Sequence, residues 1–171
     1  MKERGFDPVT IAAEEERLAH FEAGLELCPL IEAAFAGVTL GPGVGLEEAL
    51  AIDDYLDFET RAAYRARDEK LDWRKISFEK LCQYNSSFSF LDAAGARFHL
   101  PAYMICELNG EYGYGFAFSL THVSGGSEQK YSLLTPDQRA VVRQFLQHML
   151  KDRDSKIMRP EIERALKEYW L

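Results

Sequence analysis

The stretch from Ser86 to Leu108, SSFSFLDAAGARFHLPAYMICEL, constrains the fold more than any other part of the chain, because it is the most apolar and most aromatic segment. Asp92 stands where a carboxylate can accept the free N–H groups of a first helical turn. This predicts a helix that runs from Asp92 towards Leu108. Apolar side chains would cover most of its girth, and a helix of that kind is usually buried among others.

Pro101 lies inside this predicted helix. Proline lacks a backbone N–H and clashes with the preceding turn, so the carbonyl of Arg97 should lose its partner. We therefore expect a kink or a restart at Pro101. Arg97 and His99 would then lie beside a break in the most buried element, which is where we look for function first.

Further helices are predicted wherever apolar residues recur at helical spacing after a capping residue or a proline. A Gly-rich turn, GPGVG, lies between two of them and lacks the pattern of a phosphate-binding loop. The expected helices begin at Asp7 and Pro8, at Leu30, at Leu46 (reaching Arg67), at Ser77, at Asp92, at the Thr135–Gln138 capping box and at Pro160.

The fold class predicted is mainly α, a single compact helical domain of about six helices. The alternation of aromatic residues with Gly, Ala and Ser from Tyr112 to Leu120 also allows a short β-hairpin near residues 111–123. Within the one domain, 1–171, we expect an acidic N-terminal helix over residues 1–29. The core would span residues 30–150, and a linker with a C-terminal helix would span residues 151–171.

The composition favours a cytoplasmic protein. No run of 18 or more apolar residues exists, which argues against a membrane span. The first residues lack the apolar core of a signal peptide. The three cysteines, Cys28, Cys82 and Cys106, are widely spaced and form no CxxC pair, as expected for reduced thiols.

The net charge of −8 is unevenly distributed. Residues 1–60 hold 14 Asp and Glu against 3 Lys and Arg, whereas residues 61–171 hold 14 against 17. An acidic first third argues against nucleic-acid binding, which needs concentrated positive charge. It suits a basic protein partner, although a solvated helix face explains it too. The residues that would form the acidic surface are Glu14, Glu15, Glu16 and Glu22.

No motif of metal, cofactor or nucleophilic chemistry occurs. The four histidines form neither HExxH nor HxH, and no GxSxG pattern is present. Cys106 lies in the predicted buried helix, where a thiol is usually inert. We therefore predict no metal site and no cofactor, and we assign no catalytic residue.

One polar cluster remains as a candidate site. Asp53 falls on the apolar stripe of its predicted helix, and an unpaired buried carboxylate is costly, so it needs a partner. Arg97 is the predicted partner in a buried or half-buried ion pair. The cluster could be structural, as a buried network of polar side chains, or it could be catalytic. Its members are Asp53, Asp54, Arg97, His99 and Tyr103.

Three stretches together resemble a known family. They are the run from Ile31 through GPGVGLEEALAIDDY, the run FLDAAGARFHLPAYM and the run LLTPDQRAVVRQFL. They are similar to an uncharacterised family of small soluble bacterial proteins, a domain of unknown function that shares RFxLPAY and LLTPxQ motifs. The resemblance covers roughly residues 30–150 and leaves out the last helix. It implies a bacterial, cytosolic protein but no activity, and His99 stands where the family pattern has tyrosine.

These observations favour a non-enzymatic, cytosolic protein that binds another protein. An immunity protein, which neutralises a toxin, would use an acidic surface of this kind against a basic partner. The alternative is a small enzyme that uses Asp53, Arg97 and His99. The sequence predicts no membrane or nucleic-acid partner and leaves the oligomeric state open.

Overall fold

The computed structural model describes residues 7–123, 127–152 and 157–171, and it is mainly helical, as predicted. No strand occurs among these residues, and they form more helices than the six expected. In chain order the helices are α1 Pro8–Leu25, α2 Cys28–Ala34, α3 Leu46–Asp53, α4 Phe58–Arg67, α5 Phe78–Gln83, α6 Ala93–Leu108, α7 Ala117–Thr121, α8 Pro136–Met149 and α9 Arg159–Glu168. Short 3-10 helices occupy Trp73–Lys75, Ser87–Phe90 and Ser127–Tyr131.

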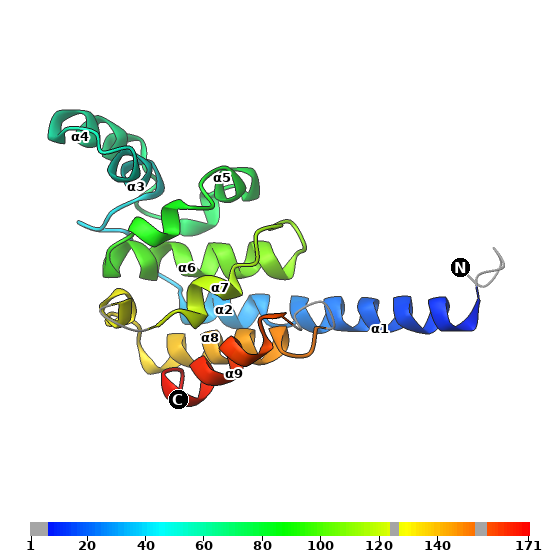
Figure 1. The fold of residues 1–171 in the computed structure, drawn as a ribbon. Coiled ribbons are helices and arrows are strands. Elements are labelled where there is room, and N and C mark those ends of the chain that lie inside the picture. The colour runs from blue at the N-terminus through cyan, green and yellow to red at the C-terminus, as the bar shows by residue number, and fades with distance from the viewer. Residues whose placement is uncertain (1–6, 124–126, 153–156) are drawn as a thin grey trace.

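Helix α6 lies at the centre of the molecule, between α5 on one side and α2 on the other (Figure 1). It begins as predicted, since the Asp92 carboxylate accepts the N–H of Gly95 at 2.8 Å. Most of its side chains are buried, and they join one continuous core. The predicted restart at Pro101 is wrong, because α6 continues through this residue. Packing of the helix on several sides offsets the loss of one backbone hydrogen bond.

Helix α8 forms the second main support of the core. The Thr135 hydroxyl accepts the N–H of Gln138, and the Gln138 side chain accepts the N–H of Thr135, which completes the predicted capping box. The apolar stripe of α8 is buried, with Phe145 at its middle. Trp170 at the C-terminus is fully buried and donates its indole N–H to the carbonyl of Leu120 at 2.8 Å.

The hairpin predicted near residues 111–123 is wrong. This segment turns at Gly115, which has a φ of 71°, and then forms helix α7. Phe116 and Leu120 are buried while Tyr114 and Phe118 are exposed. The two buried residues, Phe116 and Leu120, are therefore four positions apart. This is the spacing of one helix face, whereas a strand would bury every second residue.

The single helix predicted from Leu46 to Arg67 is also wrong. Helix α3 ends at Asp53, and the Asp57 carboxylate accepts the N–H of Thr60 at 2.9 Å to begin α4. Between them Tyr55 has a φ of 55°, the left-handed conformation that commonly ends a helix. The corner lets α4 fold back and pack on α3.

Helix α1 extends away from the rest of the molecule, with its N-terminal end far from α6 (Figure 1). Asp7 caps it and Pro8 opens it, as predicted. Gly24 near its C-terminal end is the one buried residue of the helix. Isolated helices of this length are marginally stable in water, so α1 depends on its few contacts with the body. No helix in the described part of the chain is long and apolar enough to cross a lipid bilayer.

Candidate functional site

The predicted polar cluster does not assemble. Among the described residues, no side-chain hydrogen bond or ion pair joins any two of its five members. Asp53 ends α3 and is half-exposed, Asp54 is exposed, and the Nε of Arg97 is buried without a partner. The predicted Asp53–Arg97 ion pair is therefore not found.

His99 is fully enclosed in α6 and bonds within its own helix. Its Nδ1 lies 2.8 Å from the carbonyl oxygen of Gly95, one turn earlier. Burial lowers the pKa of His99 to about 4, so the ring is neutral at pH 7 and donates this hydrogen bond. A neutral, sealed imidazole has a structural role here.

Acid should destabilise the protein through His99. The unfolded chain, in which His99 has an ordinary pKa near 6.5, takes up a proton before the folded chain does. The stability that His99 contributes is complete above about pH 6.5 and is lost as the pH falls towards 4, by up to about 3 kcal/mol. When the pH is lowered from about 7 to about 4.5, we expect the free energy of unfolding of His99→Gln to fall by about 2 kcal/mol less than that of the wild type. Urea unfolding at the two pH values measures both changes. Equal losses in both proteins would contradict a neutral buried His99.

Tyr103, the last predicted member, anchors an aromatic cluster. It is fully buried, and its hydroxyl donates to the carbonyl of Tyr84 at 2.8 Å. Its ring stacks on Phe116 at 5.0 Å and meets the edges of Phe88 and Tyr112. Burial raises the pKa of Tyr103 far above its ordinary value, so the hydroxyl keeps its proton. Tyr103 therefore joins α5, α6 and α7 and has no exposed polar atom to offer a substrate.

The GPGVG turn packs directly on the first turn of α6. Asp92 accepts the N–H of Val44 at 3.0 Å as well as that of Gly95. A Cβ on Gly95 would lie 2.1 Å from the carbonyl oxygen of Val44, and one on Gly43 would lie 2.8 Å from Cβ of Ala94. Two of the family-like stretches thus meet at a close backbone contact, and glycine is required there for space.

A charged joint, centred on Glu47 and Glu48, fixes α4 to α3. Glu48 is buried and pairs with Arg61 and Arg65 at 3.5 Å each. Glu47 pairs with Lys80 of α5 at 2.9 Å. Burial raises the pKa of Glu47, but hydrogen bonds from Lys80 and Tyr84 lower it more, and the net result is a lowered pKa.

Asp68 completes this joint from the far end of α4. Its carboxylate accepts the N–H groups of Glu47 at 2.8 Å and Glu48 at 3.3 Å, and so caps α3 in place of Gly45, which has no side chain. Burial raises the pKa of Asp68, although these two N–H donors lower it in part. The joint pairs its charges internally, with only Oε2 of Glu48 and Nε of Arg61 lacking a hydrogen-bond partner, and its role is structural. Sequence spacing places Arg61 and Arg65 on one helix face, but nothing in it points to Glu48.

The predicted acidic surface lies on α1. Glu15, Glu16 and Glu22 are exposed and Glu14 is half-exposed. Leu18 and Phe21 lie among them with 57% and 40% of their surface exposed. The helix therefore presents apolar and acidic side chains together, on an element that contributes little to the core.

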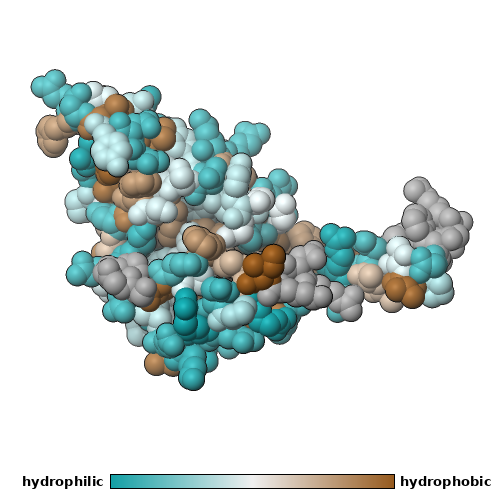
Figure 2. All heavy atoms as spheres, in the orientation of Figure 1, coloured by the Kyte–Doolittle hydropathy of each residue, from teal (hydrophilic) through white to brown (hydrophobic). Residues whose placement is uncertain are grey.

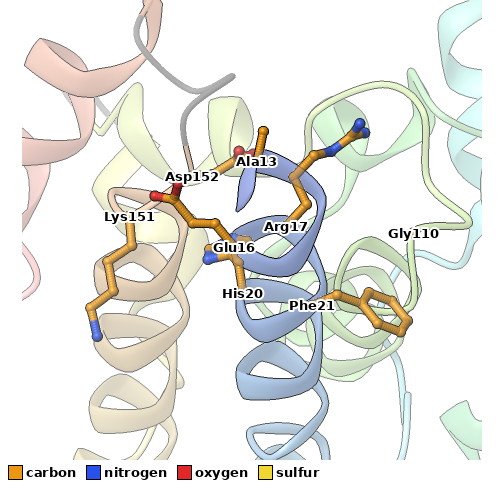
Figure 3. Close-up of a pocket in the computed structure, with 8 residues that line it drawn as sticks. All are labelled: Ala13, Glu16, Arg17, His20, Phe21, Gly110, Lys151 and Asp152. Carbon is orange, nitrogen blue, oxygen red and sulfur yellow. The ribbon is translucent and has the colours of Figure 1, made fainter. Parts of the chain in front are cut away.

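A cleft of about 460 Å³ lies where α1 meets the end of α8 (Figure 3). Glu16 and His20 of α1 line it together with Lys151 and Asp152 from the end of α8, and Phe21 lies beside Gly110 on the other side. Behind it His20 stacks on His148, with ring centroids 4.0 Å apart. Burial, and then the neighbouring His20, lower the pKa of His148 to about 4.

Gly24 explains how α1 approaches this closely. A Cβ at this position would lie 2.9 Å from Nε2 of His148 and 3.3 Å from Leu108. The contact was not predicted, because His20 and His148 are far apart in the sequence and no motif joins them. In the described part of the chain, no group of three His, Cys, Asp or Glu side chains is placed to hold a metal ion.

Comparison with known proteins shows the family to which the chain belongs. No curated protein and no solved structure is similar to this chain. The model of a family of unknown function, DUF6714, matches residues 24–171. This confirms the resemblance to an uncharacterised family, but the match extends through α9, which we had expected to lie outside it. The chain therefore belongs to this family of unknown function, and most of α1 precedes the matched residues.

Proposed function

We propose that this protein has no enzymatic activity and acts by binding another protein, with α1 as an acidic contact surface for a basic partner. The observation that carries the proposal is the exposure of α1: an 18-residue helix with Gly24 as its one buried residue. From Asp7 to Glu26 the chain has six carboxylates and one arginine. A helix that leaves the body and supports so little of the core is well placed to contact a partner.

The mixture of side chains on α1 supports protein binding in particular. Exposed apolar and aromatic residues surrounded by charged ones are typical of interaction hot spots. Leu18 and Phe21 would supply the apolar contact, and Glu14, Glu15, Glu16 and Glu22 would supply the charge. Toxin-neutralising proteins that cover a basic toxin need this chemistry, and we propose an immunity protein as the specific class.

The alternative, a small enzyme that uses Asp53, Arg97 and His99, has no observation in its favour. His99 is buried inside α6, and no side-chain hydrogen bond or ion pair joins it to either of the other two residues in the described structure. An acid–base site needs groups within hydrogen-bond reach of one another and of a substrate.

A photo-reactive residue at Leu18 should capture the partner, because this side chain is more than half exposed. We expect the triple substitution Glu14→Lys, Glu15→Lys and Glu16→Lys to slow association with the captured protein by at least about ten-fold, since electrostatic attraction governs encounter rates. The melting temperature should change little, as is usual for exposed positions.

A matched control reverses three exposed carboxylates elsewhere, Glu32, Glu79 and Glu111, and changes the net charge by the same amount. This control should slow association much less, because these residues lie outside α1. If both triple variants slow association equally, the net charge alone governs binding and α1 is not the contact surface.

A further inference from the structure

We propose that the outer face of α4, together with the corner before it, is a second docking surface, and that it takes a basic amphipathic helix of a partner protein. This α4 surface consists of Tyr55, Phe58, Ala62 and Ala66, which are all exposed, and the carboxylates around them. It goes beyond the function proposed for α1, because α3 and α4 lie at the opposite end of the molecule from the free end of α1 (Figure 1).

Helix α4 turns charged side chains towards the molecule and apolar side chains towards solvent. A surface helix normally turns its apolar stripe to the core and its charges to water. In α4 the half-buried Arg61 and Arg65 turn inward to the buried Glu48, and no residue of the helix is buried. Phe58, Ala62 and Ala66, spaced four residues apart, are exposed. The apolar side of α4 is therefore left without a partner.

Two aromatic side chains stand at one end of this stripe. Tyr55 is 95% exposed and Phe58 is 83% exposed. Tyr55 also holds the left-handed conformation in which a side chain costs stability and glycine does not. The ring of Tyr55 contributes nothing to the core, and large exposed aromatic residues are frequent anchors of protein interfaces.

The charge of the α4 surface identifies the kind of partner. Asp53, Asp54, Asp57 and Glu59 lie beside the two aromatic residues in the sequence. Arg67, with 53% of its side chain exposed, follows Ala66 at the other end of the surface, where it pairs with Glu47 at 3.9 Å. Figure 2 shows hydrophilic and hydrophobic residues side by side at the α3–α4 end of the molecule. Arg or Lys side chains of a partner would pair with the carboxylates and lie over the ring of Tyr55.

The alanines of the stripe favour a helix as the occupant. Small side chains at a spacing of four residues form a straight, shallow track on which another helix can lie closely, and amphipathic helices are a common ligand for such surfaces. A second copy of this chain fits less well, because two of the three arginines of its own α4 are turned inward to Glu48 and the third, Arg67, pairs with Glu47.

The test uses the full chain and a synthetic peptide. The probe is a helix of about 15 residues of Leu, Ala and Arg with the leucines on one face, and a scrambled peptide of the same composition is the control. Amide chemical shifts are followed in the Glu14→Lys, Glu15→Lys, Glu16→Lys variant, so that binding at α1 does not contribute. We expect shifts over residues 53–66 with the amphipathic peptide and a much weaker effect with the scrambled one.

Substitutions then locate the contact. Phe58→Ser with Ala62→Gln should weaken peptide binding by about five- to ten-fold, whereas Tyr114→Ser, at an aromatic residue exposed elsewhere, should leave it unchanged. Tyr55→Gly should raise the melting midpoint, because it relieves the left-handed conformation, and should weaken peptide binding at the same time.

Three results would overturn the proposal. Equal binding of the amphipathic and scrambled peptides would mean that charge alone is recognised. Shifts outside residues 53–66 would place the site elsewhere. Concentration-dependent shifts of α4 without peptide would assign the surface to a second copy of the chain. None of these results bears on α1, whose role is measured separately in the wild type.

Discussion

Replacing Phe145 with alanine is expected to lower the free energy of unfolding by about 3–5 kcal/mol. Phe145 is fully buried at the middle of α8, and its ring lies 6.4 Å from that of Phe116, which is also buried in the core. The substitution removes most of an aromatic side chain and leaves a cavity that the surrounding helices cannot close completely. Urea unfolding followed by tryptophan fluorescence measures the loss.

The same substitution at Phe58 is the control, because that side chain is 83% exposed on α4. Phe58→Ala should change the free energy of unfolding by about 0.5 kcal/mol or less. A loss of less than about 1 kcal/mol for Phe145→Ala would mean that α8 is not docked on the core as described.

Replacing Gly95 with alanine should destabilise the protein by about 1–3 kcal/mol, or more. Alanine in place of glycine inside a helix normally stabilises by about 0.5–1 kcal/mol, so the expected sign is reversed. The reason is that the new Cβ would lie 2.1 Å from the carbonyl oxygen of Val44, which belongs to the GPGVG turn. Neither backbone can move without breaking the hydrogen bonds that Asp92 makes to both segments.

Gly113→Ala is the matched control, since a Cβ there would meet nothing within 4 Å. Thermal unfolding of both variants is sufficient to compare them. If Gly95→Ala stabilised the protein as an ordinary helix substitution does, the GPGVG turn would not lie against α6.

The elements with strong local signals could be predicted from the sequence. Asp92 and Thr135 both cap helices as expected, because a capping carboxylate or hydroxyl acts on residues two or three positions away. The burial of α6 could be predicted because apolar side chains cover most of the circumference of this helix. The acidic residues of α1 are mostly exposed as expected, since few of the helix's side chains are needed in the core.

The corner at Tyr55 could not be predicted, because a tyrosine gives no local signal for a left-handed turn. Glycine or asparagine at this position would have indicated the end of α3. The error carried over to the candidate site. Asp53 was placed on the buried stripe of one long helix, but α3 ends at this residue and leaves its side chain half-exposed. The Asp53 carboxylate therefore needs no buried partner, and it does not pair with Arg97.

The segment around Phe116 shows a second reason why part of the fold could not be predicted from the sequence. Alternating aromatic residues fit a strand, but Phe116 and Leu120 also fit one turn of a helix, and tertiary packing decides between the two. Contacts between distant segments, such as the stack of His20 on His148 and the pairing of Glu48 with two arginines, depend on the assembled fold and have no signature in the sequence.

The most direct test of the proposed function is the dependence of partner affinity on salt concentration, in the wild type and in the Glu14→Lys, Glu15→Lys, Glu16→Lys variant. Salt screens separated surface charges over about 8–10 Å at physiological ionic strength. If α1 is the contact surface for a basic partner, the wild-type affinity should fall steadily as salt is added. The variant should bind more weakly at low salt and depend on salt much less. A partner whose affinity ignores both the added salt and the triple substitution would contradict the proposal that acidic α1 is the binding surface.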